Sequence, residues 1–213
     1  MMPSKPPGKP TSKALATRPY HHGALREALL EGAERILDRE GINGLTLRAA
    51  AREAGASHAA PKNHFDDLTA LLSELATVGF RRFHQCLLAA TPTTDSPAAR
   101  LPALGRAYVE FAMQSPGLFL LMFRGERLDF ERPGLREAMD AAAAVLQDAV
   151  GVTRDQKHAP HLPLTAAAQF VSAWSLVHGF AMLYLDNRLA PTLGRLAGRA
   201  DALTLLDEIL KRY

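Results

Sequence analysis

The chain has almost no cysteine and no long uninterrupted run of apolar residues. Cys86 is the only cysteine among 213 residues, so an internal disulfide cannot form, which favours a reducing compartment. No stretch approaches the roughly 18 consecutive apolar residues of a membrane span, and the N-terminus lacks the apolar segment of a signal peptide. We therefore expect a cytoplasmic protein without a membrane partner.

Motifs of the common enzyme classes are also missing. The sequence contains no phosphate-binding loop, no HExxH motif and no nucleophile elbow, and nothing places a histidine beside Cys86 to activate its thiol. His21 with His22, and His158 with His161, suggest metal, but neither pair is accompanied by a third ligand. We therefore expect no catalytic residue, no metal site and no cofactor.

Strand-like alternation of apolar and polar residues is absent as well, whereas helical spacing recurs along most of the chain. The clearest case is residues 23–40, an amphipathic helix of about five turns that Gly41 ends. The same spacing predicts further helices over about 47–54, 58–64, 68–90, 101–112, 117–123, 133–150, 164–189 and 197–213. We therefore predict an all-α fold.

Positive charge is unevenly placed, although the net charge is only +3. Residues 1–90 hold 12 of the 25 Lys and Arg and 9 of the 22 Asp and Glu, and the remainder holds 13 of each sign. A polyanion-binding half joined to a neutral half would have this distribution. Residues 1–19 are rich in Pro, Ser and Thr and lack acidic residues, which predicts a disordered basic arm. The arm either adds phosphate contacts or is a solvated tail.

The segment 46–65, TLRAAAREAGASHAAPKNHF, has the pattern of two short helices around a tight turn. Thr46 is a helix-capping residue before an apolar pattern, and Gly55 is the kind of residue that ends a helix. Ser57 then caps a second segment, 58–64, which carries groups able to reach phosphates or base edges. The pattern predicts a helix-turn-helix motif, and the alternative is an ordinary helical hairpin with similar caps.

Three segments around this motif keep their internal spacing over about fifty residues: GALREALLEGAERILDREG, LTLRAAAREAGAS, and HF followed by DDLTALL. Residues 23–72 thereby resemble the N-terminal domain of the tetracycline-repressor (TetR) family of bacterial transcription regulators. The resemblance implies that Thr46 and Arg48 meet the phosphate backbone and that His64 holds a phosphate. It also implies that the second helix, which Ser57 caps, faces the major groove through His58, Ala59, Ala60, Lys62 and Asn63.

The chain departs from the family pattern at two positions. Lys62 stands where family members commonly have a tyrosine, and Leu68 stands where they commonly have a lysine. Lys62 can replace the phenol's phosphate hydrogen bond with a more salt-sensitive charge contact, whereas Leu68 offers no such contact. Pro61 also lacks an N–H, which a helix tolerates within its first turn. These departures bear on DNA affinity and on the register of the second helix more than on the fold.

The C-terminal half contains the string WSLVHG at residues 174–179, which is similar to a tryptophan-histidine-glycine signature of one branch of TetR-family C-terminal domains. Trp174 and His178 are four residues apart and share a helix face. Either the pair packs in the core, with the imidazole bonded to a backbone acceptor, or His178 borders a ligand cavity. The candidate pocket residues are apolar or aromatic and lie at helical spacing: Tyr108, Phe111, Phe119, Met122, Phe123, Trp174 and His178.

These patterns predict a basic arm over 1–19, a helix-turn-helix domain over 20–68, and a ligand-binding and dimerisation domain over 69–213. We expect a transcription regulator, acting as a repressor, whose partners are double-stranded DNA, a small-molecule effector and a second copy of itself. The last two helices of each subunit would form the dimer interface on a palindromic site. The alternatives are a structural or nucleoid-type DNA-binding protein without an effector, and a small-molecule-binding protein or enzyme that uses the C-terminal cavity.

Overall fold

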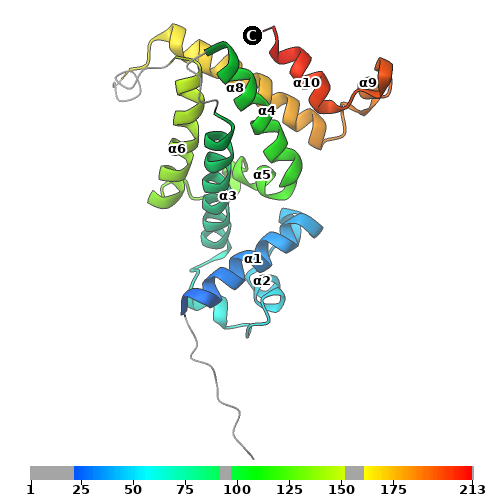
Figure 1. Cartoon of the computed structure of the whole chain (residues 1–213). Coiled ribbons are helices and arrows are strands. Elements are labelled where there is room, and N and C mark those ends of the chain that lie inside the picture. The colour runs from blue at the N-terminus through cyan, green and yellow to red at the C-terminus, as the bar shows by residue number, and fades with distance from the viewer. Residues whose placement is uncertain (1–21, 92–96, 152–160, 213) are drawn as a thin grey trace, which may run out of the picture.

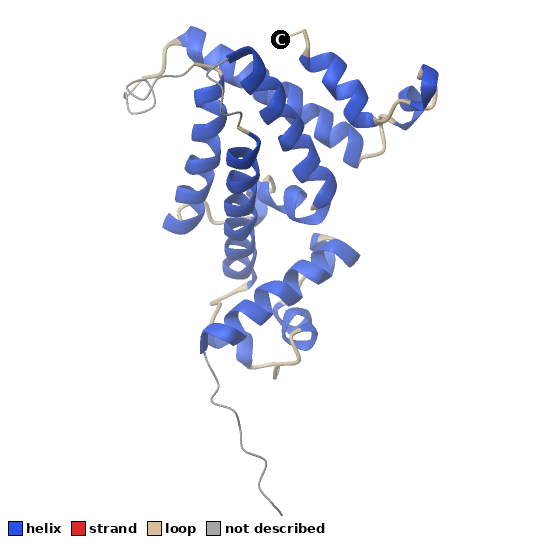
Figure 2. Ribbon diagram, in the orientation of Figure 1, coloured by secondary structure: helices blue, strands red, loops and turns tan. Residues whose placement is uncertain are grey.

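The computed structural model describes residues 22–91, 97–151 and 161–212, and the regular structure in these ranges is entirely helical (Figure 2). The prediction of an all-α fold is therefore confirmed. The arm predicted over residues 1–19 lies outside the described residues, as do His21 and His158.

A small group of helices forms one end of the molecule, and a long helix leads from it into a larger group (Figure 1). The small group consists of α1 (His22–Glu40), a 3-10 turn (Ile42–Gly44), α2 (Leu47–Glu53) and a second 3-10 turn (Ala60–Asn63). The long helix is α3 (Leu68–Ala90). The larger group consists of α4 (Pro97–Gln114), α5 (Pro116–Met122), a 3-10 turn (Gly125–Arg127), α6 (Pro133–Ala149), α8 (Leu164–Leu185), α9 (Ala190–Leu193), a 3-10 turn (Ala197–Arg199) and α10 (Ala202–Leu210).

Side-chain caps and glycines set the helix ends near the N-terminus, as the sequence predicts. The Thr46 hydroxyl accepts a hydrogen bond from the Ala49 N–H at 3.0 Å and begins α2. The Asp67 carboxylate begins α3 in the same way. Gly41 and Gly55 follow α1 and α2 with φ of 70° and 65°, a conformation that side chains with a Cβ rarely adopt. The ends at Gly41, Thr46 and Gly55 are correctly predicted because each depends on local chemistry.

The predicted ends of the two C-terminal helices are wrong. Helix α8 ends at Leu185 instead of about residue 189, because Asn187 takes a left-handed conformation with φ of 56° and turns the chain. The last helix begins at Ala202 instead of about residue 197. Gly198 interrupts the earlier turn with φ of 73°, and the Asp201 carboxylate then accepts the Thr204 N–H at 2.8 Å as the true cap.

Helix α1 is held against both α3 and α5, so one apolar core runs through the small and the large group. Arg26 of α1 pairs with Glu74 of α3 at 2.7 Å. The contact with α5 is closer, because a Cβ at Gly117 would lie 3.1 Å from the carbonyl carbon and oxygen of Leu37. A backbone obstacle of this kind cannot rotate away, so a side chain larger than that of glycine would push α5 and α1 apart at this position.

Helix α8 keeps an apolar side that the described residues do not cover. Among the described helices it alone is long and apolar enough to cross a membrane. Only 22% of its most apolar 18-residue stretch is buried. A core helix of a soluble protein, which is mostly buried, has the same length and composition. In α8, Val171 is 50% exposed and Leu183 is 47% exposed.

Because of the close approach at Gly117, substitution by alanine should change the free energy of unfolding differently at Gly117 and at Gly134. Gly117 and Gly134 each follow a proline that opens a helix, but a Cβ at Gly134 would come no nearer than 3.9 Å to another atom. We expect Gly117→Ala to lower the free energy of unfolding by about 1–3 kcal/mol. Gly134→Ala should raise it by up to about 1 kcal/mol. Urea unfolding of both variants measures the difference, and equal effects would contradict the contact with Leu37.

Candidate functional site

The predicted DNA contacts gather at the end of the molecule opposite α8 and α10 (Figure 1). Thr46 and Arg48 are exposed at the start of α2. The residues after the turn that are also exposed are Ser57, His58, Ala59, Lys62 and Asn63. Polar and basic groups on two adjacent short elements therefore share one accessible surface.

The second element of the motif is shorter than predicted, since a 3-10 turn spans Ala60–Asn63 where the sequence predicts a helix over 58–64. In an α-helix capped by Ser57, the N–H of residue 61 would donate to the Ser57 carbonyl. Pro61 has no N–H to donate. The Ala60 N–H bonds the Ser57 carbonyl instead, at 3.0 Å, which is the tighter 3-10 pattern.

Three residues near this turn are not fully exposed. Ala60 is only 8% exposed and packs inward, which does not fit the expectation that it faces a groove. His64 is half-buried, and its ring centre lies 6.5 Å from that of Phe65. Leu68 packs against the apolar core at the first position of α3. The leucine that replaces the family's lysine therefore has a packing contact at this position.

Some basic side chains near this surface form ion pairs within the chain, and others do not. Arg35 and Arg39 of α1 pair with Glu53 of α2 at 3.1 and 3.2 Å, and these hydrogen bonds lower the pKa of the Glu53 carboxyl. Arg48 and Lys62, in contrast, form no ion pair with any residue that the structure describes. Their positive charges are therefore accessible to an anion from outside the chain.

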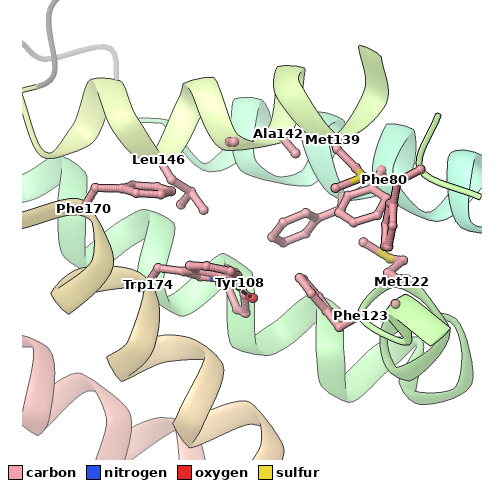
Figure 3. Close-up of a pocket in the computed structure, with 13 residues that line it drawn as sticks. Phe80, Tyr108, Met122, Phe123, Met139, Ala142, Leu146, Phe170 and Trp174 are labelled. Carbon is pink, nitrogen blue, oxygen red and sulfur yellow. Dashed lines mark hydrogen bonds between the residues drawn. The ribbon is translucent and has the colours of Figure 1, made fainter. Parts of the chain in front are cut away.

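A cavity of about 330 Å³ lies among α3, α4, α5, α6 and α8 (Figure 3). Part of its wall comes from the connection between α5 and α6, where Gly125 and Phe130 reach it. The Ser73 hydroxyl of α3 accepts the Asp129 N–H at 2.9 Å and so holds this connection in place. The lining residues are Phe80, Phe83, Tyr108, Met122, Phe123, Gly125, Phe130, Met139, Ala142, Ala143, Leu146, Phe170 and Trp174.

One hydroxyl connects the polar groups beside the cavity. The Trp174 indole N–H donates to the Tyr108 oxygen at 3.2 Å, and this oxygen lies 2.8 Å from His178 Nδ1. Burial raises the pKa of Tyr108 and lowers that of His178, so at neutral pH the tyrosine keeps its proton and the imidazole is uncharged. The fully buried Tyr108 hydroxyl then donates to Nδ1, because an unpaired buried O–H is costly.

Four of the seven predicted pocket residues line the cavity, namely Tyr108, Met122, Phe123 and Trp174. Phe111, Phe119 and His178 do not line it. Phe111 packs against Phe83, and Phe119 lies behind the wall between Tyr108 and Phe123. The imidazole of His178 bonds a side chain, the Tyr108 hydroxyl, and supports the wall from outside.

Sequence reasoning missed most of the opposite wall, which Phe80 and Phe83 of α3 and Met139 of α6 form. It also missed Phe170, whose ring stacks on Trp174 at 6.1 Å, one helical turn away. The four-residue spacing of Phe170 and Trp174 was a usable signal. No comparable signal joins α3 to α6, because their contact is distant in sequence.

The shared hydroxyl of Tyr108 predicts a cost when it is removed. We expect Tyr108→Phe to lower the free energy of unfolding by about 1–3 kcal/mol, because the Trp174 N–H and His178 Nδ1 both lose their partner. The matched control is Tyr184→Phe, since the Tyr184 hydroxyl makes no hydrogen bond to any described residue. That change should stay within about 0.5 kcal/mol. Chemical denaturation would contradict the network if both variants were equally stable.

Comparison with known proteins agrees with this arrangement. Residues 101–206 match a family described as tetracyclin repressor-like, C-terminal domain. A solved structure of a protein with unknown function from Rhodococcus sp. RHA1 is 35% identical, with a TM-score of 0.70, and the alignment covers 92% of this chain and 98% of that one. The TetR-family transcriptional regulator PfmR from Thermus thermophilus is 17% identical with a TM-score of 0.60, over 86% and 97% of the two chains, and shows the same fold.

A curated relative supports the same assignment from sequence. The uncharacterised HTH-type transcriptional regulator YobS of Bacillus subtilis (strain 168) is 29% identical over 97 residues, which are 46% of this chain. The match covers 50% of the length of that relative. Residues 101–206 therefore belong to the tetracyclin repressor-like C-terminal domain family, and the fold of nearly the whole chain is similar to that of solved TetR-family regulators.

Proposed function

We propose that the chain is a ligand-responsive repressor that binds a palindromic operator as a homodimer. The observation that carries this proposal is the aromatic cavity. Helix α5 supplies part of its wall and also packs against α1 at the helix-turn-helix end of the molecule. Its C-terminal domain would be of the tryptophan-histidine-glycine type, because Trp174 and His178 both bond the hydroxyl at the cavity wall. No catalytic step is part of the proposal.

The DNA-binding surface proposed here contains Thr46, Arg48, Ser57, His58, Ala59, Lys62, Asn63 and His64. Arg48 and Lys62 would pair with phosphates, because both are exposed and neither has an acidic partner within the described ranges. Thr46 would add a phosphate contact, while His58 and Asn63 offer hydrogen-bonding groups to base edges. Ala60 is excluded from this set by its burial.

Helix α5 would carry the response from the cavity to the DNA-binding end. Met122 and Phe123 line the cavity at the C-terminal end of α5. Gly117, near its N-terminal end, meets the backbone of α1 at Leu37. The helix has seven residues, so a shift at one end is transmitted to the other end. A ligand that prefers a shifted α5 would therefore favour a different position of α1 and of the DNA-binding surface.

The uncovered side of α8 would be the centre of the dimer interface, with α10 beside it. Val171 and Leu183 present apolar surface there, and a Cβ at Gly179 would meet no atom within 4 Å, so a partner helix can come close. A two-fold axis along this surface would place two DNA-binding ends on successive major grooves, about 34–36 Å apart on B-DNA. In this dimer a second copy, and not a membrane, would cover the apolar side of α8.

A nucleoid-type DNA binder without an effector is the second candidate for the function. Such a protein needs little beyond a basic three-helix unit, so it gives no reason for an aromatic cavity in the larger group of helices. The cavity therefore favours a regulator that senses a small molecule.

Binding to the DNA upstream of the chain's own gene tests the proposal most directly. We expect gel-shift affinity to fall steeply with salt, and Lys62→Ala to reduce the slope of log K against log salt by about one. Lys211→Ala, at the other end of the molecule, is the matched control and should leave the slope unchanged. Salt-independent binding would argue against phosphate contacts. If Lys62→Ala changed the base preference but not the salt slope, Lys62 would contact a base edge and not a phosphate.

The dimer is tested separately by placing a charge on the uncovered side of α8. Leu183 and Leu88 are 47% and 46% exposed, so they form a matched pair on α8 and α3. We expect Leu183→Lys to convert a micromolar dimer into monomers in sedimentation equilibrium, because the lysine would be buried between apolar helices. Leu88→Lys should leave the dimer intact. A wild-type chain that sediments as a monomer would remove the palindromic-site argument.

A further inference from the structure

The chemistry of the cavity wall limits what can occupy it. We propose that the effector is an uncharged, flat aromatic molecule of about two fused rings, with no anionic or cationic group. The inference rests on the proposed function, because it names the ligand class of the same cavity.

Aromatic rings make up most of the wall. Seven of the thirteen lining residues are aromatic, two are methionines, and none carries a charge at neutral pH. Figure 3 shows the rings of Phe80, Phe123, Tyr108, Trp174 and Phe170 arranged around the same space. Ring edges and faces attract another ring, and methionine sulfur adds favourable contact with it. A planar arene therefore gains more from this wall than an aliphatic chain of equal area.

The volume of the cavity sets the size of the occupant. An apolar cavity of about 150 Å³ in another protein stays dry and binds benzene. The cavity here measures about 330 Å³, roughly twice that size, which suits a bicyclic molecule better than a single ring. Phe80 and Phe123, whose rings meet edge to face at 5.8 Å, both line the cavity.

The hydrogen-bonding groups of the wall are already used. Among the lining residues, Tyr108 and Trp174 supply the only side-chain N–H and O–H groups. The indole proton is bound to the Tyr108 oxygen, and the phenol proton is bound to His178 Nδ1. No side-chain proton of these residues remains for a carboxylate, phosphate or carbonyl of the ligand. An acceptor group placed in the cavity would lose its water without gaining a side-chain partner.

Ions of either sign are disfavoured for the same reason. An anion would find no arginine, no lysine and no free side-chain donor among the lining residues, and a cation would find no carboxylate. The aromatic rings attract a cation, but this attraction is smaller than the cost of removing an ion from water into an apolar site. The wall therefore selects for neutral ligands by penalising charge.

Calorimetry with three probes of one shape tests the inference. Naphthalene, 2-naphthoate and 2-naphthyltrimethylammonium share a bicyclic ring and differ in charge. Titrated into the full chain near neutral pH, naphthalene should bind saturably at one site per chain, and each ion at least about tenfold more weakly. If naphthalene fails to bind, or if either ion binds as tightly as naphthalene, the inference is overturned.

Variants on α6 locate the binding. Ala142 and Ala143 line the cavity, whereas Ala141 does not. Ala142→Leu should weaken naphthalene binding at least about tenfold by filling the space, and Ala143→Leu serves if the first variant does not fold. Ala141→Leu adds the same volume outside the wall and should bind as wild type. Equal binding by the filled and control variants would place naphthalene elsewhere and overturn the inference.

A gel shift with naphthalene separates this inference from the proposed function. Saturable naphthalene binding without a change in DNA affinity would support the ligand class and contradict ligand-responsive regulation. DNA binding that responds to 2-naphthoate alone would support the regulation and overturn the ligand class.

Discussion

The larger group of helices is organised around the side chain of Tyr108, which is fully buried and contacts α3, α5 and α8. Its ring meets Phe83 of α3 edge to face at 5.0 Å and Phe119 of α5 at 5.7 Å. Its hydroxyl bonds two residues of α8. An apolar residue could make the ring contacts alone, but only a phenol also joins α8 to them. The position of the cavity wall therefore depends on a single polar atom in an apolar core.

Helix α5 has an unusual position for so short an element. It supplies part of the cavity wall, packs against α3, where a Cβ at Gly79 would lie 2.8 Å from Met122 Sδ, and meets α1 at Gly117. Close packing of this kind resists compression, so a displaced element moves as a body and its neighbours must adjust. Two glycines, one on α3 and one on α5, thus permit the contacts that would make the cavity and the DNA-binding end interdependent.

The sequence predicted most helices and the cap at Thr46, because helical spacing and capping are local properties. It failed where one backbone angle decided the outcome, as at Asn187, and where Pro61 removed the first donor of a helix. Four of the thirteen residues that line the cavity were predicted, and they come from α4, from the C-terminal end of α5 and from α8. The wall formed by α3 and α6 was not, since that pairing joins residues roughly sixty positions apart and has no periodic signature. The DNA-contact residues and the pocket roles remain predictions.

Trp174 is the only tryptophan in the chain, and it stands in the cavity wall with its indole nitrogen tied to Tyr108. The protein's long-wavelength ultraviolet absorption and emission therefore originate at one point of the molecule. Any molecule that enters the cavity, or any movement of α4 relative to α8, changes the surroundings of that single chromophore. The chain thus contains an intrinsic optical probe located where its proposed signal begins.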